Sequence, residues 1–277
     1  MASEYPSDPA DATPPPSQGG DLVYRHRLPV RIWHWLNALA VFVMLMSGFM
    51  IFNAHPRLYW GRYGANFDRA WLEIVPGHLH LGSLAIPTPG LLGVVVNGRM
   101  AAFPPLVTIP TSYDLAGARE WHLAFAWVLV VPGVLFWMWS IARGHARRDL
   151  APSRDELRPR HIWHDIKDHA RLRFPSGAAA RRYNILQKLS YLGVIFVALP
   201  GAVVTGMMLS PTLNAAMPWL LALLGGRQSA RSIHFLCAMW LATFILVHVA
   251  MVVLAGPINE VRSMITGRYR LPRERTE

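Results

Sequence analysis

The stretch RIWHWLNALAVFVMLMSGFM, from Arg31 to Met50, joins an Arg, a His and two Trp residues to a nearly uninterrupted apolar run. An uncharged apolar segment of about 20 residues is long enough to cross the hydrocarbon core of a membrane. The chain contains four segments of this kind, and the predicted helices cover approximately residues 31–52, 119–142, 184–209 and 231–254. We therefore predict an all-α integral membrane four-helix bundle with both termini on the same side.

The composition agrees, because 53% of the 277 residues are hydrophobic and 16% are charged. A net charge of +11 on a soluble chain would suggest a nucleic-acid partner. The positions of Lys and Arg distinguish that interpretation from one in which the charges set the membrane topology. Eleven of them lie in the loop 143–182 and five follow the last predicted helix, whereas the loop 53–118 holds four. The positive-inside rule then places both termini in the cytoplasm and the loop 53–118 in the periplasm of a bacterial inner membrane. We expect no nucleic-acid partner.

The N-terminal segment 1–22 is acidic and Pro-rich, with no basic n-region and no apolar core, so it does not resemble a signal peptide. We predict a disordered cytoplasmic tail over 1–22, followed by one membrane domain over 23–277. The single cysteine, Cys237, permits no intramolecular disulfide and is expected to be a packing residue.

The loop 53–118 contains a segment, Val75 to Gly98, without any Asp, Glu, Lys or Arg. It is a poor fifth span because its Pro and Gly residues prevent the internal hydrogen bonding that lipid requires. A fifth span would also break the charge pattern. We predict an ordered periplasmic cap, rich in aromatic residues, on which a partner docks or which touches the membrane. The alternative is a self-contained lid without a partner.

Four histidines lie near the ends of the predicted spans: His34, His122, His234 and His248. An intramembrane His alone is more often a hydrogen-bonding residue than a metal ligand, but such residues are costly and suggest function. His234 and His248 are 14 residues apart, so they share one helix face at two depths about 21 Å apart. In an antiparallel bundle, His34 comes level with His248 near the cytoplasm, and His122 with His234 near the periplasm.

Two cross-helix His pairs at two depths are what axial ligation of two haem b groups requires. We therefore predict a bundle that encloses a cytoplasmic-side haem on His34 and His248 and a periplasmic-side haem on His122 and His234. Gly48, 14 residues after His34, would leave room for the periplasmic-side haem, although Gly is also common in helix packing.

Three of the four histidines follow an Arg by three residues, in RIWH, REWH and RSIH. The arginines are Arg31, Arg119 and Arg231, and each is a candidate partner of a haem propionate, because a guanidinium suits bidentate contact with a carboxylate. The alternative is ordinary snorkelling at the end of a span.

The sequence resembles the b-type cytochrome membrane subunits of formate dehydrogenases (gamma subunit), thiosulfate reductases and Ni-Fe hydrogenases, within the cytochrome b561-like superfamily. The resemblance rests on YRHRLPVRIWHWLNAL, LYWGRYG, REWHLAFAW, RRYNILQKLSY and the two histidines of the last span. It implies an electron-transfer subunit of a respiratory oxidoreductase, working between a periplasmic redox partner and membrane menaquinone or ubiquinone. A molybdopterin enzyme is one partner that the resemblance suggests, although the longer loop 53–118 leaves its identity open.

The same resemblance places a quinone site near the cytoplasmic-side haem, with quinone chemistry as the chain's only reaction of its own. The implied residues are Asn184, Gln187, Lys188 and His248. Such a site is chemically reasonable because a quinone carbonyl needs hydrogen-bond donors and its reduction needs protons. The alternative is that Asn184 caps its helix and Lys188 snorkels.

The other histidines leave their roles undecided. His161, His164 and His169 lie in a basic amphipathic segment that favours a helix on the membrane lipid surface, with Ser153 and Glu156 in capping-box spacing. His78 and His80 would contact a partner or a metal.

Two other functions remain open at this level. One is a stand-alone cytochrome b561-like quinone oxidoreductase that acts on a small oxidant such as superoxide. The other is a haem-free transporter with a His proton relay, but the sequence lacks the inverted repeats and the acidic, broken spans typical of transporters.

Overall fold

The computed structural model describes residues 20–143, 152–153, 155–171 and 185–271. Most of the predicted tail, much of the basic loop 143–182 and Asn184 lie outside the described residues, as does the side chain of His169. Among the described residues, the helices long and apolar enough to cross a membrane are Leu28–Phe52, Leu115–Ala142, Ile185–Leu209 and Arg227–Ala255. The four predicted spans are therefore confirmed as helices, and three of them begin earlier than predicted.

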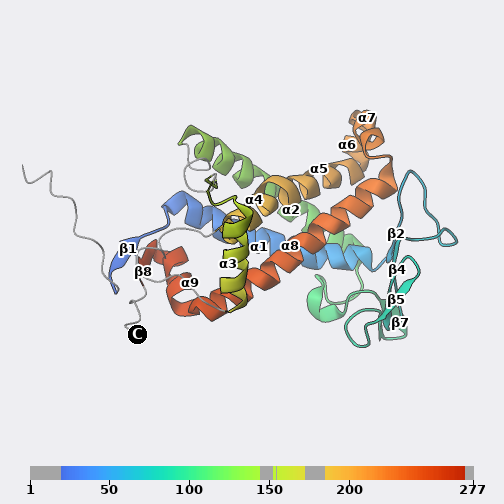
Figure 1. Ribbon diagram of the computed structural model, residues 1–277. Coiled ribbons are helices and arrows are strands. Elements are labelled where there is room, and N and C mark those ends of the chain that lie inside the picture. The colour runs from blue at the N-terminus through green and yellow to red at the C-terminus, as the bar shows by residue number, and fades with distance from the viewer. Residues whose placement is uncertain (1–19, 144–151, 154, 172–184, 272–277) are drawn as a thin grey trace, which may run out of the picture.

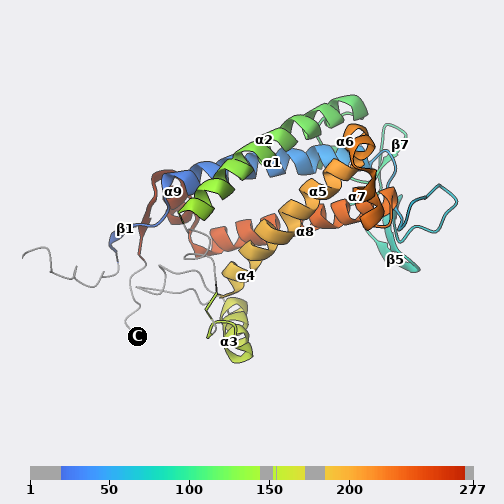
Figure 2. The same cartoon turned by 90° about the horizontal axis from the view of Figure 1, so that it is seen from above.

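The four spans are arranged as two helix pairs. Helix α1 (Leu28–Phe52) packs along α2 (Leu115–Ala142), and the third span packs along α8 (Arg227–Ala255). Figure 2 shows the two pairs side by side. A site between the pairs is therefore reached by side chains from both.

The third span changes its winding halfway. It consists of α4 (Ile185–Gly193), a π-helical turn (Val194–Ala198) and α5 (Leu199–Leu209). In the turn, the N–H of Leu199 bonds to the carbonyl of Val194, five residues back. The next residue, Pro200, has no N–H, and its ring would clash with the carbonyl four residues back in a regular helix. A wider turn at this point accommodates both constraints.

The interior of the bundle is apolar at mid-depth, and so is its outside. All four spans contribute to one buried cluster, made of Ala40, Val41, Leu129, Val194, Ala198 and Leu241. On the outside, Trp127, Ile141 and Leu246 are 70%, 70% and 73% exposed. Helices that are apolar all round fit lipid rather than water. The chain is an integral membrane protein.

The two ends of the described chain meet at one end of the bundle. Strand β1 (Leu22–Tyr24) pairs antiparallel with β8 (Arg268–Arg270), which follows helix α9 (Pro257–Thr266). Figure 1 shows these elements together beside the start of α1. We call this the termini end.

At the opposite end, the loop 53–118 folds into strands that the all-α prediction did not include. The described chain is mostly helical, with a four-stranded antiparallel sheet in the order β2-β3-β4-β5 and a separate β6-β7 hairpin. The strands are β2 (Arg57–Leu58), β3 (Leu72–Val75), β4 (His78–Leu81), β5 (Leu84–Pro87), β6 (Val94–Val96) and β7 (Arg99–Ala101). We call this the sheet end.

The sheet is held by its own small core. In β3, Leu72 and Ile74 are buried and alternate with Glu73, as expected for a strand with one covered face. They pack with Phe103 against Phe52, the last residue of α1. The sheet is therefore continuous with the helical bundle.

Hydrogen bonds tie the loop to the first turns of α8. The Ser232 hydroxyl donates to the carbonyl of Tyr59 at 2.6 Å and accepts from the indole N–H of Trp71 at 2.9 Å. The Ser229 hydroxyl accepts from the N–H of Gly61 at 2.8 Å. The loop is an ordered cap, as the sequence suggested.

Short helices complete the described chain. Helix α3 (Pro159–Ala170) contacts α4, while α6 (Pro211–Ala216) and α7 (Pro218–Leu223) connect α5 to α8. Before α3, the N–H of Ser153 donates to the Glu156 carboxylate at 2.7 Å and the N–H of Glu156 to the Ser153 hydroxyl at 3.3 Å. This confirms the capping-box interaction, although it lies in the turn before the helix.

Candidate functional site

Four histidines on three spans form two facing pairs. His34 on α1 and His248 on α8 have ring centroids 6.3 Å apart, and His122 on α2 and His234 on α8 have theirs 6.1 Å apart. We call the first the termini-end pair and the second the sheet-end pair. The structure thus brings together the same two pairs that depth and helix direction predicted.

The spacing within each pair fits one metal ion between two rings. An imidazole nitrogen lies about 2.0–2.1 Å from a metal that it ligates, so two rings on opposite sides of one ion have centroids about 6 Å apart. A direct hydrogen bond of about 3 Å between two ring nitrogens would bring the centroids closer. Imidazole is a ligand of haem iron, so the two histidines of each pair would hold one haem between them. Among the described residues there is no cluster of three or more His, Cys, Asp or Glu placed to hold an ion without such a cofactor.

The His122 ring is held from α1. Its Nδ1 lies 3.1 Å from the carbonyl oxygen of Met44 and 3.1 Å from the hydroxyl of Ser47. A carbonyl only accepts, so Nδ1 carries the proton and donates it. Nε2 is then the nitrogen with a free lone pair, which is the form that binds a metal.

The His234 ring is held in the same way from α5. Its Nδ1 lies 2.9 Å from the carbonyl oxygen of Ala202 and 3.1 Å from the hydroxyl of Thr205. The same reasoning assigns the proton to Nδ1 and leaves Nε2 available. Both rings of the sheet-end pair are therefore oriented by a neighbouring helix, an arrangement common around metal-binding histidines.

Glycines lie against both rings of the sheet-end pair. A Cβ added to Gly48 would be 3.4 Å from Cε1 of His122, and one added to Gly206 would be 3.3 Å from Cε1 of His234. Gly48 was singled out from the sequence, whereas Gly206 was not. A side chain larger than Ala at either position would push against a ring.

The termini-end pair has different surroundings. The ring of His248 stacks on Phe244 at 5.6 Å, and Trp35 meets His34 edge-on at 5.1 Å. The Nδ1 of His34 is buried and has no hydrogen-bond partner among the described residues. An orphaned buried nitrogen is costly and is expected where an additional group is to be accommodated.

The three candidate propionate arginines lie in different environments. The guanidinium of Arg31 donates to the carbonyl of Ile265, that of Arg231 donates to the carbonyls of His55 and Arg57, and Arg119 is exposed. Arg231 thus contributes to anchoring the loop. Contact with a propionate stays a prediction for all three.

Of the quinone-site candidates other than His248, Gln187 and Lys188 lie at the start of α4, and Asn184 is outside the described residues. The ammonium of Lys188 donates to the Glu156 carboxylate at 2.7 Å and 2.9 Å. Burial alone would raise the pKa of Glu156, but the hydrogen bonds from Lys188 and from the N–H of Ser153 hold it below its ordinary value. Lys188 is therefore engaged in an ion pair in this structure.

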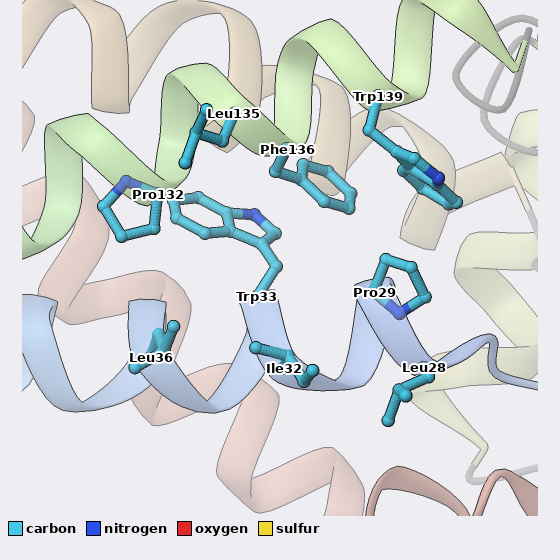
Figure 3. A pocket seen from close by; sticks show the side chains of 9 residues that line it. All are labelled: Leu28, Pro29, Ile32, Trp33, Leu36, Pro132, Leu135, Phe136 and Trp139. Atoms are coloured by element: carbon cyan, nitrogen blue, oxygen red, sulfur yellow. The ribbon is translucent and has the colours of Figure 1, made fainter.

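A groove between α1 and α2 lies near the termini end. Its volume is about 390 Å³. Figure 3 shows its lining, made of Leu28, Pro29, Ile32, Trp33, Leu36, Pro132, Leu135, Phe136 and Trp139. Every lining side chain is apolar, so the groove suits a hydrocarbon chain and not an ionic ligand.

The remaining histidines belong to neither of the two pairs. His78 and His80 lie two apart on β4, and His161 lies 4.0 Å from Asp165 on α3. Burial, followed by the positive charge of Arg25, lowers the pKa of His26 to about 4. His26 is therefore neutral at physiological pH.

Sequence reasoning missed the residues that orient the sheet-end pair. Ser47 and Thr205 are 0% and 2% exposed, and each is followed directly by a glycine. The repeated hydroxyl–glycine pair in two spans was a usable signal. This signal points to a function only when each hydroxyl–glycine pair is placed at the depth of His122 and His234 in the bundle.

Comparisons with known proteins agree with this arrangement. The family described as prokaryotic cytochrome b561 matches residues 25–267. "Putative protein-methionine-sulfoxide reductase subunit YedZ1" of Azospira oryzae is 29% identical over 229 residues, which are 81% of this chain and 88% of the relative.

"Probable Ni/Fe-hydrogenase B-type cytochrome subunit" of Cupriavidus necator is 23% identical over 260 residues, 89% of this chain and 86% of the relative. The protein of the same description from Azotobacter vinelandii is 21% identical over 263 residues, 90% and 88% of the two chains. No solved structure matches the chain significantly.

The family match spans almost all of the described chain and includes all four paired histidines. A b-type cytochrome family implies haem b as the cofactor, and the two imidazole pairs provide suitable ligands. The protein is therefore a membrane cytochrome that belongs to the prokaryotic cytochrome b561 family.

Proposed function

We propose that this chain is a dihaem cytochrome b that transfers electrons across a bacterial inner membrane, between a redox enzyme subunit and the quinone pool. The observation that carries the proposal is the pair of facing imidazoles at each of two levels of the bundle, 6.3 Å and 6.1 Å apart. Each level would hold one haem b, on His34 and His248 at the termini end and on His122 and His234 at the sheet end.

Haem b, when bound, supplies reversible one-electron transfer. The protein supplies position: the two histidines of α8 fix the two levels about 21 Å apart along one helix. That spacing divides a hydrocarbon core of about 30 Å into shorter steps. The apolar cluster between the levels keeps water and ions out of the middle of the bundle.

The orientation in the membrane follows from charge. The pairing of β1 with β8 brings both described chain ends together, and in the sequence the loop 143–182 between the second and third spans carries eleven Lys and Arg residues. The positive-inside rule favours the cytoplasm for this termini end. The sheet end then lies in the periplasm.

The sheet end would receive a redox enzyme subunit. Around the loop between β2 and β3, the exposed aromatic side chains include Trp60, Tyr63 and Phe67, which are 53%, 84% and 103% exposed. In Figure 1 this loop extends beyond the ends of the helices, away from the region that lipid would surround. The relatives from Azospira oryzae and Cupriavidus necator are named as subunits of a sulfoxide reductase and a hydrogenase, which supports a redox partner.

Quinone would react at the termini end, beside the pair His34 and His248. The orphaned Nδ1 of His34 shows a buried polar group that a further ligand can satisfy. Gln187 and Lys188 lie on the first turn of α4, where they would offer hydrogen-bond donors to a quinone. The ion pair of Lys188 with Glu156 would open or reorganise if Lys188 contacts quinone.

The deciding experiment is an absorption spectrum of the purified full-length protein, with chemical quantification of haem. A reduced b-type spectrum with two haems per chain is expected. One haem per chain would contradict the dihaem arrangement. A colourless protein that stays colourless after reconstitution with haem would overturn the proposal and favour a haem-free role for the histidines.

A further inference from the structure

Two spans carry the same short arrangement at the sheet end. On α1, the carbonyl of Met44 is followed three residues later by the hydroxyl of Ser47 and then by Gly48. On α5, Ala202, Thr205 and Gly206 repeat the spacing. Residues three and four apart share a helix face. Each span therefore presents three features on one helix face: a backbone carbonyl, a side-chain hydroxyl and a glycine without a side chain.

Each arrangement meets one ring of the sheet-end pair. The hydroxyl protons are already used within their own helices, since Ser47 donates to the carbonyl of Val43 at 2.7 Å and Thr205 to that of Gly201 at 2.5 Å. The hydroxyl lone pairs are then free to accept. The Nδ1–H of His122 and that of His234 each have two acceptors, one hydroxyl at 3.1 Å and one carbonyl.

Two acceptors on one N–H make an imidazole a stronger electron donor. The acceptors draw the proton away from the ring and raise the basicity of the opposite nitrogen. A more basic axial ligand favours ferric over ferrous iron, and hydrogen bonding around the ligands is one of the means by which a protein sets a haem potential. Burial strengthens the effect because water does not compete for the N–H.

The termini-end pair differs in this respect. The Nδ1 of His34 is buried without a hydrogen-bond partner among the described residues. In the part of the chain that the structure describes, no hydroxyl is hydrogen-bonded to this nitrogen. The two proposed haem sites thus both use histidines, but the hydrogen bonding of the rings differs between the two ends.

We propose that Ser47 and Thr205 are positioning residues that accept from the Nδ1–H groups of His122 and His234, orient the two rings and lower the reduction potential of the sheet-end haem. The proposal rests on the proposed function, since it concerns a haem that these histidines would bind. It makes the sheet-end haem the more reducing of the two, so that electrons pass more readily from the sheet end to the termini end.

The test is a potentiometric titration of the haem-loaded full-length protein, with the wild type compared with Ser47→Ala, Thr205→Val and the double variant. The spectrum of His248→Ala, which removes a ligand of the other haem, assigns the sheet-end signal. We expect the sheet-end haem to become easier to reduce in each single variant. In the double variant, a tenfold change in the reduction equilibrium is expected, which is about 59 mV for one electron.

Matched variants separate the hydroxyl contact from general packing. Ser47→Thr and Thr205→Ser keep the hydroxyl and should retain the wild-type potential. Ser263→Ala removes another buried hydroxyl, which donates to the carbonyl of Glu260 at 2.7 Å on α9, and should leave both potentials unchanged. Electron paramagnetic resonance of the ferric protein should show an altered sheet-end signal in Ser47→Ala, in Thr205→Val and in the double variant, but not in Ser47→Thr, Thr205→Ser or Ser263→Ala.

The outcomes are distinguishable. A wild type without haem refutes the proposed function. A wild type with two haems, whose sheet-end potential is unchanged in the double variant, refutes this inference and leaves the function intact. Equal shifts in Ser47→Thr and Ser47→Ala would also refute it. Loss of the sheet-end haem in the double variant, with recovery in the hydroxyl-retaining variants, would support the positioning role.

Discussion

The sheet-end pair and the termini-end pair each consist of two histidines at nearly the same spacing, but the surroundings of their rings differ. At the sheet end, His122 and His234 each donate to a carbonyl and face a hydroxyl on a neighbouring span. At the termini end, His34 has an orphaned Nδ1 and His248 stacks on Phe244. The two pairs therefore have nearly equal distances between ring centroids but different hydrogen bonding around the rings.

This difference would suit different roles for the two pairs. A pair held by uncharged hydrogen bonds keeps its geometry while only electrons pass. A pair with an unsatisfied nitrogen leaves polar capacity for a substrate that brings its own hydrogen-bonding groups and protons, as quinone does. Variants that affect one pair and spare the other measure how independent the two ends are.

The largest effect is expected from removing one ligand of each pair in turn. His234→Ala should abolish the sheet-end haem and His248→Ala the termini-end haem, each leaving about one haem per chain. Haem quantification with low-temperature spectra would separate the two signals. Loss of both haems in either variant, with the protein still folded by circular dichroism, would show that the two pairs do not bind haem independently.

The second-largest effect is expected when a side chain is added at a glycine beside a sheet-end ring. A Cβ on Gly206 would lie 3.3 Å from His234, so Gly206→Leu should displace the ring and reduce sheet-end haem content several-fold. Gly206→Ala should have a smaller effect. The control on the same helix is Gly201→Ala, whose Cβ would meet the sulfur of Cys237, 2.9 Å away, and no histidine. Equal haem loss in this control would show a packing effect instead.

Releasing the anchor of the loop should have a local effect. Arg231→Ala removes the guanidinium donor from the part-buried carbonyls of His55 and Arg57, at a cost of about 1–3 kcal/mol in total, because the His55 carbonyl still accepts from the N–H of Arg57. Hydrogen exchange at Gly61 and in β2 and β3 should increase, while Arg119→Ala, at an exposed position, should change little. If Arg231→Ala leaves exchange unchanged but shifts the sheet-end potential, a propionate contact becomes the better explanation.

The smallest effect concerns pH at the termini end. The pKa of Glu156 is lowered in the folded protein, so its pairing with Lys188 is fully present above about pH 4.5 and is lost as the pH falls through the folded value. Glu156→Gln should cost at most about 1 kcal/mol at neutral pH, as for other partly exposed pairs. The difference in melting temperature from the wild type should shrink as the pH falls below about 4.5, and a difference that stays constant with pH would contradict this.

The sequence allowed the levels of the histidines to be predicted, for a clear physical reason. The length of an apolar span fixes the depth of its residues in the membrane, and the antiparallel direction of neighbouring helices fixes which residues lie at the same depth. The pairing of His34 with His248 and of His122 with His234 therefore followed from the sequence. The rotation of each helix about its axis is set by packing among four spans. For that reason the contacts of Ser47 and Thr205 could not be derived in the same way.

The strands of the loop 53–118 were not predicted, although at least one of the turns between them is visible in the sequence. Asn97 and Gly98 both have positive φ, 50° and 75°, and join β6 to β7 as an Asn-Gly hairpin turn. The prolines and glycines of this loop were interpreted correctly as evidence against a fifth span, but not as turns between strands. For Arg231, the spacing before His234 could not reveal that its guanidinium turns toward the loop carbonyls.

The π-helical turn at Val194–Ala198 has a consequence for how the protein can vary. One additional residue in a helix rotates everything beyond it by about 100° relative to a regular helix. It is this rotation that directs Ala202, Thr205 and Gly206 toward α8 while α4 keeps its own orientation. Deleting a single residue between Val194 and Ala198 would turn that surface toward lipid, so the length of this span, and not only its composition, encodes one half of the sheet-end site.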